Sequence, residues 1–199
     1  MVADQIRARG VTDARVLDAM IQVPRHLFIP EDDRGDAYED RPVGIGFGQT
    51  ISQPYIVAYM TEALRIEPSH RVLEIGTGCG YQTALLAGLA REVYSIERIE
   101  ALAAIARRTL EELGYTNVHL RTGDGHAGWP EEAPFDRILG AAAAASVPPA
   151  LVEQLVDGGI LVIPVGTSDQ TLEVLRKRGG TTELLSSLAV RFVPMIREP

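Results

Sequence analysis

Cysteine, net positive charge and long apolar runs are all scarce in this chain, and each shortage excludes a class of protein. Cys79 is the single cysteine, so no disulfide can form within the chain. The formal net charge is −8, whereas a protein that binds nucleic acid electrostatically needs a basic face. No stretch approaches the ~18 consecutive apolar residues of a membrane-spanning helix. We therefore expect neither a nucleic-acid partner nor a membrane partner.

Motifs for metal binding and for export are missing as well. The four histidines are scattered, and neither C-x-x-C nor H-E-x-x-H occurs, so we expect no catalytic metal. The chain starts without a basic region followed by an apolar segment, which makes a cytoplasmic location the expectation. Its 199 residues, 46% of them hydrophobic, suffice for one sizeable core. We predict a single domain, 1–199, that works as a monomer.

The most informative stretch is a short apolar run followed by an acid, a glycine-dense turn and a helical pattern. Residues 72–75 suit a strand buried on both faces, and residues 82–90 suit a helix that packs back on it. The glycines between them let the backbone turn sharply and come close to a ligand. Tyr81 stands where the dinucleotide fingerprint has its third glycine, and no Gly-Lys-Ser/Thr follows, so neither a nicotinamide site nor a P-loop is favoured. A tight turn without a ligand is the minor alternative.

Two acids downstream fit a nucleoside-like ligand at this turn. Glu97 ends a strand predicted over 92–97, close to where an acid bonds ribose hydroxyls in open α/β sheets. Asp124 lies in a Gly-Asp-Gly turn, where its carboxylate could accept a hydrogen bond from an adenine amino group. Taken alone, Glu97 could be an exposed charge at the end of a strand, and the Gly-Asp-Gly turn could be a generic loop. Cys79 is better explained as a small side chain that lines a pocket than as a nucleophile.

The beginning of the chain predicts helical structure. Residues 1–30 contain an apolar stripe at helical spacing, with Thr12 or Asp13 as its cap and Pro24 as its stop. For Arg25, which follows that proline, a solvated or capping role is more probable than a catalytic one. The segment therefore predicts a helical extension ahead of the central α/β pattern.

A glycine-rich segment precedes a helix that begins near Pro54. Its glycines at positions 44, 46 and 48 make a continuous helix or a regular strand improbable. On local grounds Ser52 is an N-cap, and no G-x-S-x-G elbow is present to make it a nucleophile. Four side chains that can form hydrogen bonds lie directly ahead of the helix, namely Gln49, Thr50, Ser52 and Gln53.

The second half of the chain alternates strands and helices and then ends in a hairpin. This order predicts an α/β fold with a mostly parallel sheet and an antiparallel C-terminal edge. A run of small residues over 140–145 leaves open space at the carboxyl end of one strand, where ligands bind in such sheets. The predicted strands are 117–121, 135–139 and 160–166, the helices are 101–113 and 147–156, and the hairpin strands are 171–176 and 184–193.

These stretches together resemble the protein-L-isoaspartate O-methyltransferases, and the resemblance runs across nearly the whole chain. The pattern E-x-G-x-G-x-G is shared by many class I S-adenosylmethionine methyltransferases, whereas Gln-Thr-Ile-Ser-Gln-Pro at 49–54 is specific to this family. The resemblance implies a Rossmann-like class I methyltransferase sandwich. It also divides the chain into a helical extension with the substrate and active-site segment (1–55), a cofactor-binding core (56–166) and a C-terminal hairpin (167–199). Further stretches that carry the resemblance are 24–28, 72–84 and 190–194.

The same resemblance assigns roles to individual residues. It reverses the local interpretation of Ser52, which takes the active-site serine position beside Thr50. S-adenosylmethionine is the implied cofactor, and no metal is implied. The implied cofactor-binding residues are Glu74, Gly76, Thr77, Gly78, Glu97, Asp124 and Gly125, and the implied substrate-binding residues are Gln49, Ile51 and Val193.

The implied reaction is repair of damaged proteins and peptides by methylation of the α-carboxylate of L-isoaspartyl residues. Such a carboxylate, with a pKa of ~3.3–3.9, is already ionised at neutral pH, so no general base is required. Two alternatives remain on sequence grounds. A class I enzyme acting on a small metabolite would leave the segment 49–54 unexplained, and a peptide-versus-metabolite activity screen would separate the two. A non-catalytic module would bind the cofactor without forming S-adenosylhomocysteine.

Overall fold

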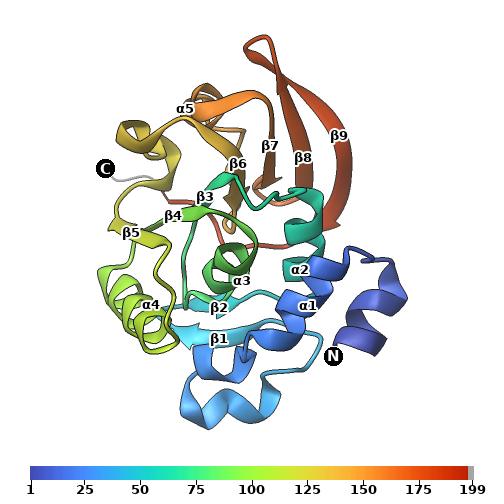
Figure 1. The fold of residues 1–199 in the computed structure, drawn as a ribbon, viewed down its shortest axis with the longest axis vertical. Helices are drawn as coiled ribbons and strands as arrows, with labels where there is room; N and C mark the ends of the chain where they lie inside the picture. Colours follow the sequence, from blue (N-terminus) through green and yellow to red (C-terminus); the bar gives the residue numbers. More distant parts are fainter. Residues whose placement is uncertain (197–199) are drawn as a thin grey trace.

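The computed structural model describes residues 1–196, which are organised around one seven-stranded sheet (Figure 1). Its strand order is β5-β4-β3-β6-β7-β8-β9, with parallel pairing from β5 to β7 and an antiparallel edge formed by β8 and β9. This arrangement confirms the predicted fold class. The strands are β3 (Arg71–Ile75), β4 (Glu92–Glu97), β5 (Val118–Thr122), β6 (Phe135–Gly140), β7 (Leu155–Val165), β8 (Gln170–Arg178) and β9 (Thr181–Val190).

Helices cover both faces of this sheet. The helices α2 (Pro54–Ala63) and α3 (Tyr81–Leu89) pack on one face, and α5 (Pro149–Gln154) packs on the other. Because successive residues of a strand point to opposite faces, Val72 joins the α2 and α3 core while Leu73 joins the α5 core, and both are fully buried. The strand β3 is therefore buried on both faces, as its apolar run predicted. The remaining α-helices are α1 (Ala14–Gln22) and α4 (Glu100–Glu112).

Short helical turns make up much of the rest. Two lie ahead of α1, two more separate α1 from the glycine-rich segment, and two lie between β5 and β6. Among residues 1–196, no helix combines the length and the apolar character needed to cross a membrane. The turns are η1 (Val2–Ile6), η2 (Arg7–Arg9), η3 (Arg25–Phe28), η4 (Glu31–Asp36), η5 (Gly125–Ala127) and η6 (Pro130–Glu132).

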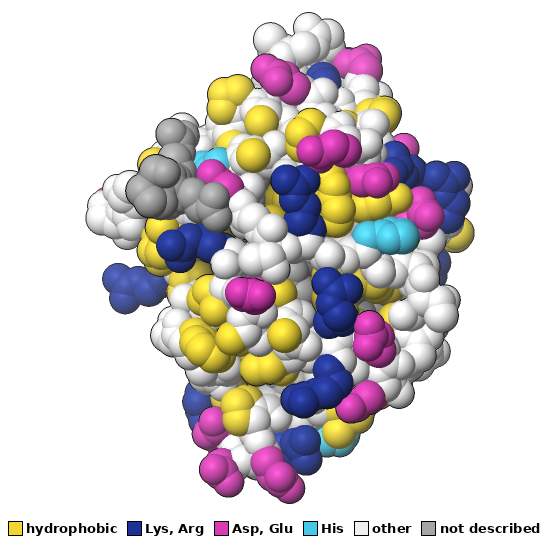
Figure 2. All heavy atoms as spheres, turned by 90° about the vertical axis from the view of Figure 1, so that its left-hand side faces the viewer, with side chains coloured by type: hydrophobic (Ala, Val, Ile, Leu, Met, Phe, Trp, Pro, Cys, Tyr) yellow, Lys and Arg dark blue, Asp and Glu magenta, His cyan; other side chains and the backbone are white. Residues whose placement is uncertain are grey.

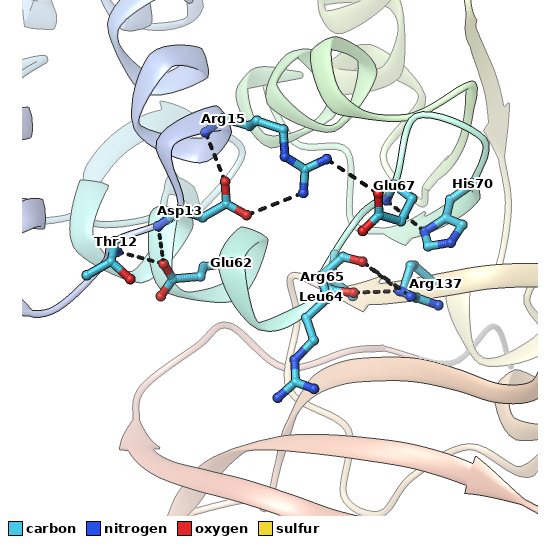
Figure 3. A network of polar contacts seen from close by, with 9 residues as sticks. All are labelled: Thr12, Asp13, Arg15, Glu62, Leu64, Arg65, Glu67, His70 and Arg137. Carbon is cyan, nitrogen blue, oxygen red and sulfur yellow. Dashed lines mark hydrogen bonds and ion pairs between the residues drawn. The ribbon is translucent and has the colours of Figure 1, made fainter.

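The N-terminal segment is tied to α2, the helix that follows the predicted active-site segment. Asp13 caps α1 by accepting a hydrogen bond from the amide of Arg15 at 2.9 Å, as predicted. On α2, Glu62 accepts hydrogen bonds from the amides of Thr12 and Asp13 at 2.7 Å each (Figure 3). At the C-cap of α2, two residues after Glu62, Arg137 of β6 donates to the carbonyl of Leu64 (Figure 3). The C-terminal end of α2 is thus fixed both to the start of α1 and to the sheet.

The N-terminal segment also shares a hydrophobic core with the cofactor-binding half. Ile6, Leu17 and Phe28 belong to the same buried cluster as Leu85 of α3 and Leu102 of α4. This shared core supports the predicted single domain, which stays a prediction. Its last three residues, 197–199, lie outside the described residues.

The glycine-rich segment forms a short hairpin with an irregular register between Gly44 and Gly46, so neither a continuous helix nor a regular strand occurs there, although the sequence did not predict the hairpin. The strand β1 (Val43–Gly46) pairs antiparallel with β2 (Gln49–Ile51) as a separate two-stranded sheet. The connection is tight because Gly48 adopts a φ of 70°, which glycine reaches without steric cost. The N-cap of α2 is Gln53, so the local interpretation of Ser52 as a cap was also wrong.

The helix predicted over 147–156 is shorter than expected. The structure ends α5 at Gln154, and Leu155 already begins β7 by pairing with Phe135 of β6. Leu155 is buried between strand and helix, and this tertiary pairing overrides a local pattern that suits either structure.

Candidate active site

A cleft lies at the carboxyl ends of β3, β4 and β6, where open α/β sheets bind ligands. Its first wall is the glycine turn, residues 76–80, together with the end of β4. The opposite wall, which we call the hairpin wall, consists of Ile45 and residues 49–52. The cleft is completed by the small residues after β6 and by the C-terminal segment. The predicted site residues that line it are Gln49, Thr50, Ile51, Ser52, Gly76, Thr77, Gly78, Glu97, Gly125 and Val193.

The glycine turn is held against the neighbouring strand by its backbone. Gly76 has a φ of 93° and donates its amide to the carbonyl of Ile96 at 2.8 Å. Gly125 approaches the same region so closely that a Cβ atom there would lie 2.2 Å from Cγ2 of Ile75. The missing side chain of Gly125 therefore lets its loop pack against Ile75, which lines the cleft together with Ile96.

Glu97 connects the two loops of the first wall. Its carboxylate accepts a hydrogen bond from the amide of Gly78 at 2.8 Å and another from the amide of Ile99 at 2.9 Å. The side chain lines the cleft and is 7% exposed. A carboxylate fixed in this position is well placed to accept hydrogen bonds from ligand hydroxyls.

Glu74, which the family resemblance implied to be a cofactor-binding residue, does not line the cleft. Its side chain is fully buried behind the glycine turn, where Oε2 accepts hydrogen bonds from Thr83 and Ser95 at 2.6 Å each. Ser95 also shares a 2.6 Å hydrogen bond with Thr77, which does line the cleft. Burial raises the pKa of Glu74 to about 7. In this structure Glu74 supports the turn through Ser95 and Thr77, and its role in cofactor binding stays a prediction.

Asp124 lies beside the cleft but not on its wall. Its carboxylate accepts a hydrogen bond from the amide of His126 at 2.9 Å and lies 3.0 Å from Nδ1 of the same residue. The neighbouring Gly123 and Gly125 do line the cleft. The contact of Asp124 with an adenine amino group stays a prediction.

The hairpin wall carries the predicted active-site serine. The hydroxyl of Ser52 has no hydrogen-bond partner among residues 1–196, although the side chain lines the cleft, so it is available to a ligand. Its carbonyl accepts a hydrogen bond from Nη2 of Arg25 at 2.8 Å. Thr50 lies in the antiparallel pair with Gly44, which sets its position in the wall.

Arg25 is fully buried, so the solvated or capping role expected for it was wrong. Its Nε donates to the carbonyl of Ala37 at 2.7 Å, and its guanidinium lies 4.8 Å from the ring centroid of Tyr81. Burial lowers its pKa. Through Ser52 and Tyr81, this one side chain joins the hairpin wall to the start of α3.

The C-terminal segment closes the cleft over the alanine run. The amide of Ala143 donates to the carbonyl of Val193 at 2.8 Å, and the amide of Met195 donates to the carbonyl of Ala143 at 2.7 Å. Gln170 fixes this segment by exchanging two hydrogen bonds with the backbone of Phe192. The predicted open space over 140–145 is thus partly filled, and Ala141 and Ala142 are the residues of the run that line the cleft.

A protein-family model described as protein-L-isoaspartate(D-aspartate) O-methyltransferase matches residues 1–198 of the chain. The chain belongs to this family.

Individual relatives agree with the family model. A protein-L-isoaspartate O-methyltransferase of Opitutus terrae is 59% identical over 200 residues, covering 100% of this chain and 86% of the relative. One of Gloeobacter violaceus is 53% identical over 200 residues, covering 100% and 98%. A Plasmodium falciparum protein assigned to the same family, solved with S-adenosyl-L-homocysteine, superposes with a TM-score of 0.83 at 27% identity, covering 96% of this chain and 95% of that one. Another solved member has a TM-score of 0.83 at 29% identity and covers 94% of this chain and 62% of that one.

The cleft of this protein-L-isoaspartate O-methyltransferase family member contains residues that the sequence did not single out. Arg98 and Ile99 follow the predicted ribose acid, and Met195 and Ile196 extend the C-terminal segment. Apolar residues in loops carry no periodic signal, and only the position of Ile99 directly after Glu97 could have indicated it. Cys79 lines the cleft, as predicted, and burial raises its pKa to about 11, so it is a thiol at neutral pH. Within residues 1–196, no group of three or more metal-binding side chains occurs.

Proposed function

We propose that this chain is a repair methyltransferase that transfers a methyl group from S-adenosylmethionine to the α-carboxylate of L-isoaspartyl residues in damaged proteins and peptides. One observation carries the proposal. A single cleft has the cofactor turn with Glu97 on one wall and the family-specific segment 49–52 on the other. Cofactor and acceptor can therefore meet inside it.

The residues that line the cleft fit S-adenosylmethionine, which supplies an electrophilic methyl group when bound. Gly76, Thr77 and Gly78 offer a turn that can approach the ligand closely, and Glu97 offers acceptors for ribose hydroxyls. Gly125 fits as well, because without a side chain its loop can lie against Ile75 and line the cleft.

On the other wall, Ser52 and Thr50 orient the acceptor carboxylate. The Ser52 hydroxyl can donate a hydrogen bond to one carboxylate oxygen, which leaves the other oxygen to attack the methyl carbon. The acceptor needs no base, since a carboxylate with a pKa of ~3.3–3.9 is ionised at neutral pH. Ile51 and Val193 contribute apolar surface that excludes water from the reacting groups. Catalysis then rests on alignment, for which a fixed hairpin wall is required.

The decisive test uses two peptides that differ only in having L-isoaspartate or L-aspartate at one position. The purified protein is incubated with S-adenosylmethionine and each peptide, and base-labile methyl ester is measured. We expect ester on the isoaspartyl peptide alone. Ester on neither peptide, in the presence of cofactor binding, would overturn the proposal and favour a small-metabolite acceptor.

We also propose that the chain acts as a cytoplasmic monomer without nucleic-acid or membrane partners. The formal net charge of −8 supports the absence of a nucleic-acid partner. On the face drawn in Figure 2, Lys and Arg side chains are interspersed with acidic ones. Light scattering after size exclusion is expected to give a mass near 21.6 kDa, and a mass of a dimer or larger would overturn the monomer.

A further inference from the structure

The turn of the β1–β2 hairpin holds an aromatic residue in an unfavourable backbone conformation. Among residues 1–196, Phe47 and Arg65 are the non-glycine residues with positive φ, at 53° and 50°. Phe47 and Gly48 form a two-residue connection, since Gly46 pairs with Gln49, and both connecting residues have positive φ. Asparagine followed by glycine is the favoured pair for such a turn, whereas a bulky residue is strained there.

Packing does not compensate for this strain. The Phe47 side chain is 58% exposed, which makes it one of the more exposed large hydrophobic residues among those described. A structural role would bury the ring or place a glycine or asparagine at this position. Strain of this kind clusters at functional sites, where a side chain must be held in one place.

Phe47 lies in the turn of the hairpin, between residues that belong to the hairpin wall. Ile45 precedes the turn and Gln49 follows it, and both line the cleft, whereas Phe47 does not. Ile45 also lies against the glycine turn, with its Cδ1 3.4 Å from where a Cβ of Gly78 would be. In Figure 1, β1 runs toward the side of the molecule that Figure 2 shows, and hydrophobic side chains are visible in both halves of that face. A ligand confined to the cleft does not reach Phe47, but a polymer that continues out of the cleft does.

The acceptor in the proposed reaction is such a polymer. The substrate chain continues in both directions from the isoaspartyl residue that carries the reacting carboxylate. An extended segment of it advances about 3.3 Å per residue. We propose that Phe47 is a substrate-specificity residue that packs on an apolar side chain flanking the isoaspartyl residue. This inference rests on the proposed function. An exposed ring on a stiff turn suits the task, because aromatic side chains bury a large area with few rotatable bonds.

The test compares two isoaspartyl peptides that differ only in a leucine or a serine next to the isoaspartyl residue. For the natural chain we expect a lower KM on the leucine peptide. In Phe47→Asn that KM rises about tenfold, the preference disappears, and kcat and cofactor affinity stay unchanged. Because asparagine suits the turn, the melting temperature is expected to hold or rise. A merely structural role would instead lower it. Phe47→Tyr keeps the ring and is expected to retain the preference.

A matched control is Ile21→Gln, which removes an equally exposed apolar side chain, 64% exposed, from α1. We expect this variant to keep the natural KM on both peptides. An active natural chain whose Phe47→Asn variant keeps both the KM and the preference would overturn this inference alone. A natural chain that methylates neither peptide would overturn the proposed function and this inference together.

Discussion

The wall that contains the glycine turn is formed by loops that follow strands of the seven-stranded sheet, whereas the hairpin wall belongs to a separate sheet of two strands. Around the glycine turn, Gly76 and Glu97 bond to neighbouring backbone groups of the main sheet and its loops. The hairpin wall instead depends on its own ladder, on apolar packing and on Arg25. The cofactor side is therefore fixed by the fold as a whole, while the acceptor side depends on few polar contacts. Substitutions that disturb the glycine-turn wall should therefore mainly affect cofactor binding, and substitutions that disturb the hairpin wall should mainly affect methyl transfer.

The largest effect concerns Glu74, behind the glycine turn. Burial raises its pKa in the folded protein from 4.5 to about 7, so the folded state holds the proton more tightly than the unfolded state. The stability that protonated Glu74 contributes to the folded state is fully present below pH about 4.5 and is lost as the pH rises through about 7. The loss in the free energy of unfolding amounts to about 3 kcal/mol. Urea unfolding should show the natural chain losing about that much stability relative to Glu74→Gln between these pH values.

The control for this prediction is Glu112→Gln, which removes an exposed carboxylate at the end of α4. It should follow the pH dependence of the natural chain. If Glu74→Gln also follows it, the carboxyl group of Glu74 is not responsible for the slope.

The second effect concerns Arg25 and would act mainly on the hairpin wall, which loses the hydrogen bond to the Ser52 carbonyl, whereas the start of α3 loses the ring contact with Tyr81. In Arg25→Met the carbonyls of Ser52 and Ala37 lose their donors, and the wall shifts. Misplacement by about 1 Å can cost about 100-fold in rate, so we expect kcat on an isoaspartyl peptide to fall by about that factor. Cofactor affinity should change little. Arg9→Met, which removes a half-exposed arginine that also stacks on a tyrosine, is the matched control. Equal loss of cofactor affinity and kcat in Arg25→Met would contradict the separation of the walls.

The third effect concerns Glu97 and would weaken the cofactor side alone. Glu97→Gln loses charge-assisted hydrogen bonds with the amides of Gly78 and Ile99, each worth roughly 1.5–3 kcal/mol. We expect the Kd for S-adenosylmethionine, measured by calorimetry, to rise about tenfold or more. Glu100→Gln removes the same charge from the start of α4, outside the cleft lining, and should leave the Kd as it is. An unchanged Kd in Glu97→Gln would remove this residue from the cofactor site.

The contrast between the walls also explains how much the sequence could predict. The mostly parallel sheet with its antiparallel edge followed from apolar runs such as 72–75 and from alternating strands and helices, because those patterns report burial directly. The strand order is known from the structure alone. The glycine turn followed from its spacing. The hairpin did not, because three glycines indicate a broken strand unless the pairing of Gly46 with Gln49 is known.

Side-chain partners far apart in the sequence were beyond the same reasoning. Arg25 is buried through contacts with Ala37, Ser52 and Tyr81, none of which a local pattern connects to it. Glu74 was placed correctly on its strand, but its direction depends on Ser95 of the neighbouring strand. In both cases tertiary contacts decide whether a charged residue faces solvent, a ligand or the core.

The most direct test of two separable walls is a Ser52→Ala variant, with calorimetric titration of S-adenosylmethionine and methyl-ester formation on an L-isoaspartyl peptide measured on the same preparation. The structure predicts an unchanged Kd for the cofactor and a loss of methyl transfer by at least about tenfold, the cost of one hydrogen bond to a charged group. Full activity with an unchanged Kd would show that Ser52 does not orient the acceptor, and a weakened Kd would show that the two walls do not act separately.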